Sequence, residues 1–160
     1  LKDRVEARMA MVDIAASGAD NLLDSDQLEA LVTEELTYRE KQLIRLRDEV
    51  IALEELIANA LIHRDYFVSA PVRILVFSDR VEIISPGHLP NNLTIENIKM
   101  GDSIIRNPIL ASYATKILPY RGIGSGIIRA LKEYADIDFE DDHDGNRFIV
   151  TVLREKYETN

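Results

Sequence analysis

Three polar residues recur at intervals of four in an otherwise apolar segment, LEELIANALIHRDYF at residues 53–67. Glu55, Asn59 and His63 would lie on one face of a helix, because residues four apart stack one above the other. Carboxylate and amide oxygens suit Mg²⁺, and a carboxylate can accept a proton from an attacking water. The spacing indicates a site for a magnesium-bound phosphate group; a polar face that contacts solvent or caps a neighbouring loop is the alternative.

A glycine-rich segment, RGIGSGIIRAL, is the second candidate site. Gly122, Gly124 and Gly126 come just before a predicted helix, where backbone N–H groups can bind an anion because no Cβ blocks their approach. Phosphate is the natural ligand, and a simple turn is the alternative. The segment lacks the Lys-Ser/Thr pair of a P-loop and does not directly follow a strand. Standard P-loop helicase chemistry is therefore not expected.

A turn at the end of a predicted strand, IISPGHLP, is the third candidate site. Ser85 would place a small polar side chain at the strand end, and Gly87 allows a tight turn between Pro86 and His88. Such a turn suits the floor of a pocket for a flat ring. Its simpler interpretation is a Pro-Gly turn that ends a strand and binds nothing.

A long helix is predicted ahead of these segments. Apolar residues recur at helical spacing with charged residues between them, which predicts an amphipathic helix that packs against a partner or dimerises. The apolar positions are Leu28, Leu31, Val32, Leu36, Leu43, Leu46, Val50 and Leu53. We assign no chemistry to this helical arm, residues 1–50, and treat residues 51–160 as the domain that carries the candidate sites.

Two hairpins are predicted farther along the chain. The β-rich runs 72–78 and 81–85 are separated by a tight turn at residues 79–80. The last apolar segment turns at residues 144–145, an Asp-Gly pair typical of hairpins.

Between the hairpins the pattern is helical. After a loop, Asn107 is a candidate helix cap, with Pro108 in the first turn, and a second helix follows the glycine-rich segment. The order of helices and strands predicts an α/β (α+β) sandwich whose mixed or antiparallel sheet carries helices on one face.

Composition excludes several classes of protein. The 160 residues contain no cysteine, so disulfides, thiol catalysis and thiolate metal sites are excluded, and the spacing of the three histidines does not predict zinc. The net charge of −9 argues against a nucleic-acid-binding surface, so we expect any DNA-binding part to lie in domains outside this chain. No apolar run is long enough to span a membrane and no signal peptide is apparent, so a cytoplasmic protein is expected.

The three candidate sites together resemble the Bergerat-fold (GHKL) ATPases, which include gyrase, MutL and the sensor histidine kinases. In their order along the chain, ELIANALIH resembles the asparagine box, SPGHLP occupies the place of the adenine-binding turn, and GIGSG occupies the place of the phosphate loop. More closely, ALEELIANALIHRDY, FSDRVEIISPGHLP, RNPIL and LPYRGIGSGIIRAL are similar to the C-terminal ATPase-like domain of RecG-related bacterial transcriptional regulators that carry AlbA/Schlafen-type N-terminal domains.

This resemblance implies roles for the residues of the asparagine box and the phosphate loop. Glu55 would be the general base and Asn59 the magnesium ligand, and His63 matches a residue one turn later in the sensor kinases. The phosphate loop would bring Gly122, Gly124, Ser125 and Gly126 to ATP. The resemblance implies ATP and Mg²⁺ as cofactors.

The adenine-binding turn departs from the superfamily, because Ser85 stands in place of its aspartate and Leu89 in place of its second glycine. A neutral serine would hold an adenine amino group less strongly than a carboxylate, by about 1 kcal/mol. Arg106 and Arg121 are candidates for balancing phosphate charge, because a planar guanidinium group fits phosphate oxygens. The alternative for each arginine is an ion pair on an acidic surface.

Three functions remain open from the sequence. The first is an ATP- and magnesium-binding regulatory domain of a transcriptional regulator, with slow hydrolysis through Glu55. The second is a dedicated ATPase. The third is a nucleotide-free interaction domain that keeps the fold and forms a homodimer through its N-terminal helices.

Overall fold

The computed structural model describes residues 25–118 and 124–154 of the chain. Its helices and strands are α2 (Ser25–His63), β1 (Arg73–Val76), β2 (Arg80–Pro86), α3 (Ile95–Met100), α4 (Pro108–Ile117), α5 (Ser125–Glu133), β3 (Ile137–Asp142) and β4 (Arg147–Leu153). The chain divides into two units, of which one comprises Arg45–Glu155. Of the other unit, the described part is the first half of α2, residues 25–44. Among the described helices, none combines the length and the apolar character needed to cross a membrane.

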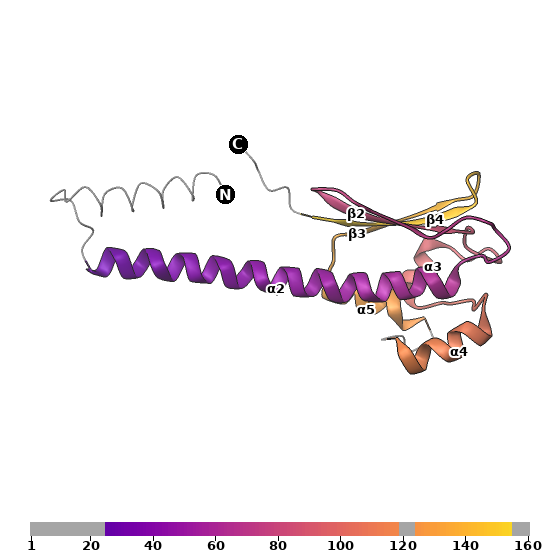
Figure 1. The fold of residues 1–160 in the computed structure, drawn as a ribbon, viewed down its shortest axis with the longest axis horizontal. Helices are drawn as coiled ribbons and strands as arrows, with labels where there is room; N and C mark the ends of the chain where they lie inside the picture. Colours follow the sequence, from indigo (N-terminus) through magenta and orange to yellow (C-terminus); the bar gives the residue numbers. More distant parts are fainter. Residues whose placement is uncertain (1–24, 119–123, 155–160) are drawn as a thin grey trace. The chain divides into compact units, whose positions relative to one another are not determined.

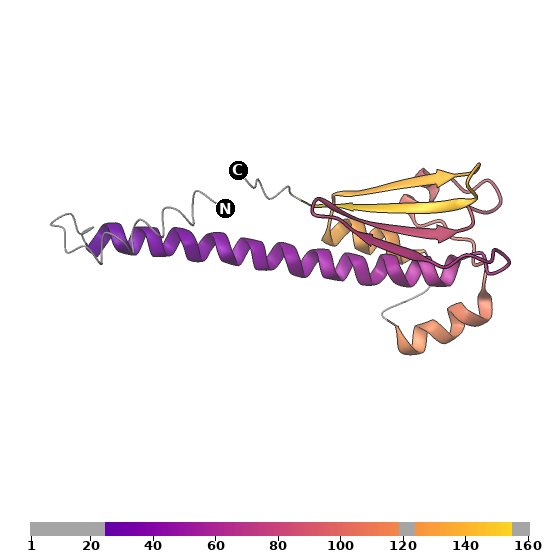
Figure 2. The ribbon, with the colours of Figure 1, turned by 45° about the horizontal axis from the view of Figure 1, so that its top comes forward.

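The sheet of the Arg45–Glu155 unit is antiparallel throughout, with strand order β1-β2-β4-β3. The part of α2 that belongs to this unit, together with α3 and α5, lies on one face of the sheet (Figures 1 and 2). The predicted fold class is therefore confirmed, with the antiparallel alternative being correct. Both predicted hairpins are present: β1 pairs with β2, and β3 pairs with β4 across a turn formed by residues 143–146.

The core of this unit lies between the sheet and two helices. Ala52 and Leu56 of α2 and Ala130 of α5 pack against the inner faces of the central strands. Those strands contribute Val81, Ile83, Val150 and Val152 to the buried cluster. Burial of these apolar side chains is the main favourable contribution to folding, so the C-terminal part of α2 is an integral part of the domain.

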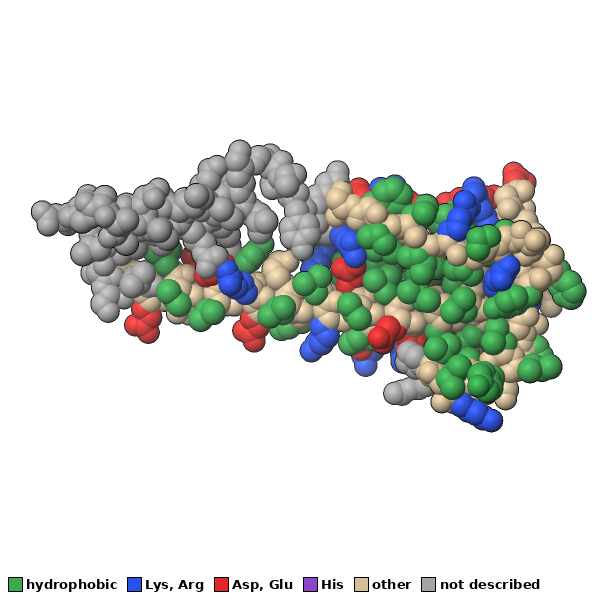
Figure 3. All heavy atoms as spheres, in the orientation of Figure 1, with side chains coloured by type: hydrophobic (Ala, Val, Ile, Leu, Met, Phe, Trp, Pro, Cys, Tyr) green, Lys and Arg blue, Asp and Glu red, His purple; other side chains and the backbone are tan. Residues whose placement is uncertain are grey.

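Helix α2 presents an unexpected face to the sheet. Glu49 and Glu55 are only 5% and 6% exposed. In contrast, several apolar side chains of the predicted packing stripe are exposed, with Leu36 at 62% and Leu43 at 66% exposed, although Leu53 of the same stripe packs against the core. Figure 3 shows hydrophobic side chains at the surface along α2. Burial therefore selects a face of α2 that is partly charged.

Helix α3 occupies a segment for which the sequence predicts only a loop. Thr94 accepts a hydrogen bond from the backbone N–H of Asn97, and the Asn97 side chain accepts one from the N–H of Thr94. This reciprocal pattern is a capping box, which satisfies two N–H groups at the start of the helix. The prediction of a loop here is wrong. The sequence signal was missed because the third residue of the helix is Asn97, whereas a capping box usually has Glu or Gln at that position.

Asn107 occupies the N-cap position of α4, as predicted, but its side chain makes no capping bond there. Instead, its amide Nδ2 donates to the carbonyl oxygens of Ile62 and Arg64, both at 2.8 Å. The last carbonyl groups of a helix have no partner within the helix. Asn107 therefore caps the C-terminal end of α2, and these two bonds hold the start of α4 against the end of that helix.

Replacing Asn107 with Asp distinguishes the two capping roles. Asp is as good an N-cap as Asn, but it has no N–H to donate and its charge would face carbonyl oxygens. We expect Asn107→Asp to lower the free energy of unfolding by about 1–3 kcal/mol, at least as much as Asn107→Ala, since two hydrogen bonds are lost. The measurement is urea unfolding of the full chain. Asn92→Asp, which adds the same charge in an exposed loop, is the control, and a neutral Asn107→Asp would contradict the assignment.

Candidate functional site

A pocket of about 80 Å³ opens between α2, the end of β2 and the segment that follows α3. Six of the residues singled out in the sequence line it, namely Asn59, His63, Ser85, Gly87, Arg106 and Gly124. The other walls are mainly apolar, with Leu56, Ile83, Ile98 and Val150 among them. Residues more than sixty positions apart in the sequence thus meet around one cavity.

Ser85 supplies the most enclosed polar group of this pocket. Its side chain is 6% exposed, and its hydroxyl donates to the carbonyl oxygen of Ala60 at 3.1 Å. Because the single hydroxyl proton is used in this bond, the oxygen can only accept from a further partner. The wall of the pocket at Ser85 therefore favours a ligand that carries a hydrogen-bond donor.

The turn after Ser85 requires glycine. Gly87 has φ of +96°, and a Cβ there would collide with the side chains of Arg106 and Asp65. Its N–H donates to the carbonyl oxygen of Asn146 at 2.8 Å, so the turn is fixed to the β3–β4 hairpin. The tight turn expected at Gly87 is thus present, and its conformation brings the following residues over the pocket.

Arg106 uses its guanidinium group to hold backbone in place. It donates to the carbonyl oxygen of His88 and, at 3.5 Å, to that of His63 at the end of α2. A positive charge at a helix C-terminus is stabilising. In this conformation, Arg106 joins the turn to α2, and balancing phosphate charge would require it to release these carbonyl groups.

His63 closes the end of the pocket next to Arg106. Its Nδ1 lies 3.3 Å from the carbonyl oxygen of Ile104 and acts as donor, because a carbonyl can only accept. Burial lowers the pKa of His63, an effect larger than that of this hydrogen bond, and the charge of Arg106 lowers it further. The imidazole is therefore neutral at pH 7, with Nε2 left as an acceptor.

Glu55 lies beside the pocket and is held by an ion pair. Arg129 of α5 donates from Nε to Oε1 at 3.0 Å and from Nη2 to Oε2 at 2.6 Å. A two-bond pair of this kind fixes both partners in one geometry. The carboxylate that the resemblance assigns as general base is thus bound on both oxygens by an arginine that we did not identify from the sequence.

Gly126 brings α5 into direct contact with α2 at Asn59. A Cβ on Gly126 would fall well inside contact distance of Asn59 Nδ2 and close to Glu55 Oε2. The Asn59 amide donates to the carbonyl oxygen of Glu55 at 2.8 Å, which orients its Nδ2 along the helix. Gly126 is therefore needed for close packing of α5 against α2, independently of any ligand.

Two of the predicted phosphate-loop residues, Arg121 and Gly122, lie outside the described residues. Gly124 is the N-cap of α5 with φ of +64°, and among the described residues no side chain makes a capping bond at this helix start. Ser125 Oγ accepts from Arg129 Nη1 at 3.1 Å. The glycine-rich segment thus leads into a helix as predicted, and Arg129 could have been suspected from its position one turn after Ser125.

The contact between Gly126 and Asn59 can be tested by a double-mutant cycle. Gly126→Ala forces a methyl group against the Asn59 amide, and we expect it to destabilise the domain by about 1–3 kcal/mol, as overpacking does. In an Asn59→Ala background the methyl group has room, so the same change should cost little or become favourable because Ala is the better helix former. Urea unfolding of the four proteins gives the coupling energy; additive effects would show that the two residues do not touch.

Comparisons with known proteins show the family of this chain. Residues 69–152, more than half of the chain, match the family model described as "Putative ATP-dependent DNA helicase recG C-terminal". The crystal structure of the DIP2311 protein from Corynebacterium diphtheriae is similar, with a TM-score of 0.56 and 25% sequence identity. That match covers 64% of this chain and 23% of the DIP2311 chain. No curated protein matches the chain. The chain belongs to the RecG C-terminal family, and its Arg45–Glu155 unit contains an ATPase-like domain of RecG-related proteins.

Proposed function

We propose that this domain binds ATP together with Mg²⁺ in the pocket between α2 and β2 and that occupancy of the pocket regulates attached domains. The observation that carries the proposal is the pairing of an apolar cavity with one enclosed acceptor, the Ser85 hydroxyl oxygen. Ligand pockets typically combine apolar walls with a few well-placed polar groups. Membership of an ATPase-like family supplies the class of ligand.

The residues present fit the base of a nucleotide. Apolar side chains such as Leu56, Ile83 and Ile98 would face the flat ring, and Ser85 would accept from an exocyclic amino group. Adenine has this donor, while hypoxanthine has a carbonyl oxygen at the same position. Since the Ser85 proton is already given to Ala60, the site should distinguish the two bases.

The phosphate groups of the nucleotide would be bound by residues of α2 and by the start of α5. Asn59 offers its amide oxygen as the magnesium ligand, and the uncapped start of α5 at Gly124 offers backbone N–H groups. A bound Mg²⁺ would supply positive charge to the phosphates. We infer that Arg121 and Gly122 take part with Ser125 and Gly126, and that Arg106 contributes after releasing its carbonyl partners.

Binding is tested by calorimetric titration of the full chain with ATP and with ITP, each with and without Mg²⁺. We expect ATP to bind more tightly than ITP by about fivefold, the effect of one hydrogen bond of about 1 kcal/mol. Ser85→Ala should remove most of this preference, whereas the exposed hydroxyl variant Ser112→Ala should keep it. Asn59→Ala should weaken binding only when Mg²⁺ is present. Absence of heat and of any thermal shift with ATP would reject the nucleotide site.

Hydrolysis is a separate part of the proposal. Glu55 would act as the general base only after its oxygens are released from Arg129, so we propose that turnover is slow and depends on opening of this pair. Slow hydrolysis would suit a regulatory domain, because ATP would stay bound long enough to affect the attached domains.

The Glu55→Gln variant tests this role, since the amide oxygen can still accept from Arg129 while the base is removed. We expect nucleotide affinity to stay within about threefold, and turnover to fall about 100-fold, the usual contribution of a general base. Phosphate release under saturating ATP is the measurement. Equal turnover in the wild type and the variant would show that Glu55 is not the base and would leave a sensor without hydrolysis.

A nucleotide-free interaction domain is the second candidate function. It is favoured by the surface of α2, where Val32, Leu36 and Leu43 are exposed at helical spacing, a pattern suited to pairing with a second copy. In this alternative, the domain dimerises through its helical arm, and contacts with DNA are made by other domains of a transcriptional regulator. The titration with ATP separates the alternatives, since only the first predicts binding.

A further inference from the structure

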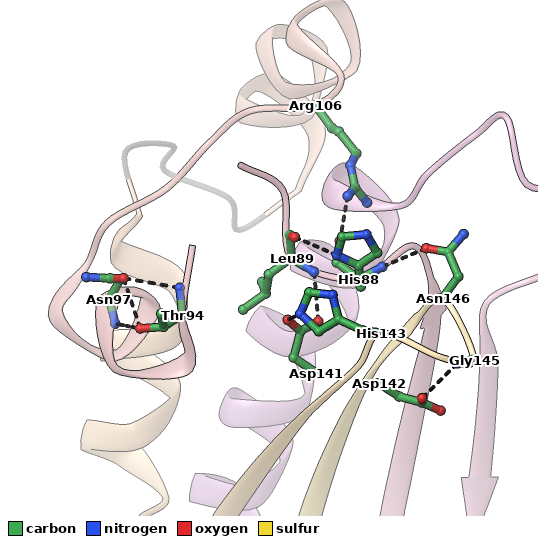
Figure 4. A network of polar contacts seen from close by, with 10 residues as sticks. All are labelled: His88, Leu89, Thr94, Asn97, Arg106, Asp141, Asp142, His143, Gly145 and Asn146. Atoms are coloured by element: carbon green, nitrogen blue, oxygen red, sulfur yellow. Dashed lines mark hydrogen bonds and ion pairs between the residues drawn. The ribbon is translucent and has the colours of Figure 1, made fainter. Parts of the chain in front are cut away.

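Two histidines and a carboxylate meet at the end of the sheet, outside the group of residues that we assign to ATP. His88 follows β2, Asp141 belongs to β3 and His143 lies in the β3–β4 turn. One possible ligand atom from each residue lies within 4.8 Å of those of the other two. Figure 4 shows the two rings next to each other with the Asp141 carboxylate beside them, and the ring centroids are 4.3 Å apart. We name this group the His88–Asp141–His143 cluster.

His88 is already arranged as a metal ligand. Its Nδ1 lies 2.8 Å from the carbonyl oxygen of Leu89 and must donate to it, because a carbonyl only accepts. In the neutral ring the lone pair is then on Nε2. Histidines that bind metals commonly use this arrangement, in which the second nitrogen donates to a backbone carbonyl and fixes the ring.

Asp141 is held in the same way. Its Oδ1 accepts from the backbone N–H of Leu89 at 2.8 Å, so the residue that orients His88 also orients the carboxylate. The side chain of Asp141 is only 12% exposed, whereas that of His143 is 66% exposed. The side chains of His88 and Asp141 are therefore held in place by hydrogen bonds, whereas the exposed ring of His143 has room to move.

The remaining contact joins His143 Nε2 to Asp141 Oδ2 at 2.8 Å. Ligands of a tetrahedral zinc ion lie roughly 3.3 Å apart, as follows from bond lengths near 2.0–2.1 Å. The three side chains therefore need shifts of an ångström or so, which the exposed His143 ring can supply. An ion would take the position of the proton that now lies between His143 and Asp141.

We propose that the His88–Asp141–His143 cluster binds one divalent transition-metal ion, of which Zn²⁺ is the physiological choice. Imidazole and carboxylate ligands suit Zn²⁺ and Co²⁺, and three protein ligands leave a fourth position for water. Asp144 follows His143 in the β3–β4 turn and adds a negative charge there, whereas Asp142 is paired with Arg147. Spacing along the chain could not predict this site, because His88 lies 53 positions from Asp141, and only the sheet brings them together.

Metal binding here would stabilise one wall of the pocket. The carbonyl oxygen of His88 accepts from Arg106, and His88 and Leu89 both line the cavity. An ion on His88 would tie this wall to the β3–β4 turn, in addition to the hydrogen bonds that the N–H groups of Gly87 and His88 donate to Asn146. The proposal does not depend on the nucleotide, because the cluster is complete without it.

The test is titration of the chelator-treated full chain with ZnCl₂, followed by calorimetry, and with CoCl₂, followed by visible absorption. We expect one equivalent of either ion to bind and the Co²⁺ complex to show the intense bands of four-coordinate cobalt. His88→Ala, His143→Ala and Asp141→Asn should each weaken binding by about 100-fold or more, since loss of a supporting group alone costs 10–100-fold. Asp141→Asn keeps an oxygen that can accept from Leu89 N–H.

Matched controls separate a built site from general attraction to acidic residues. Asp144→Asn removes a charge from the same turn without touching the cluster, and it should leave Zn²⁺ affinity within about threefold, as expected for a screened surface charge. Unfolding by urea in the presence of a chelator confirms that each variant is folded. Equal Zn²⁺ binding by all four variants, or the absence of a one-to-one Zn²⁺ complex in the wild type, would overturn the proposal. ATP titration of the same samples reports on the nucleotide site independently.

Discussion

Two buried ion pairs fix helix α2 to the rest of the domain, and the geometry of the candidate site depends on them. Glu49 is bound by Arg154, which follows β4, with Nη2 and Oε1 at 2.6 Å, and Glu55 is bound by Arg129 of α5. A carboxylate that loses its partner in such a setting costs about 3–5 kcal/mol when burial is complete. The pairs therefore select one rotation of α2 against the sheet, and this rotation aims Asn59 and His63 at the pocket.

The Glu55 pair also has a chemical consequence. The residue that would serve catalysis is the one that holds the helices together, so activating it means loosening the contact between α2 and α5. Gly126 lies in the same contact, against Asn59. If these three residues bind a nucleotide as we propose, binding would alter the packing between α2 and α5 as well as fill the pocket.

Much of the fold could be predicted from local patterns in the sequence. Both hairpins follow from β-rich runs bounded by turn residues, and Pro108 and Gly87 occupy the positions that their backbone properties require. The roles of Asn107 and Arg129 could not be predicted, because each depends on a partner that is distant in the sequence. The exposed Leu46 and Val50 of α2 show the same limit: periodicity identifies an apolar face of the helix, but packing of Ala52 against distant strands, together with ion pairs to distant arginines, accompanies burial of a different face.

Helix α2 contains neither glycine nor proline between Ser25 and His63. Kinks in helices arise mainly at such residues, so none is expected between Arg45 and His63, the part of α2 that belongs to the Arg45–Glu155 unit. Glu49 and Asn59 therefore lie on one continuous stretch of helix. Any contact that displaces Glu49 from Arg154 would also displace Asn59 at the wall of the pocket, so an event at one end of the sheet could be felt at the other.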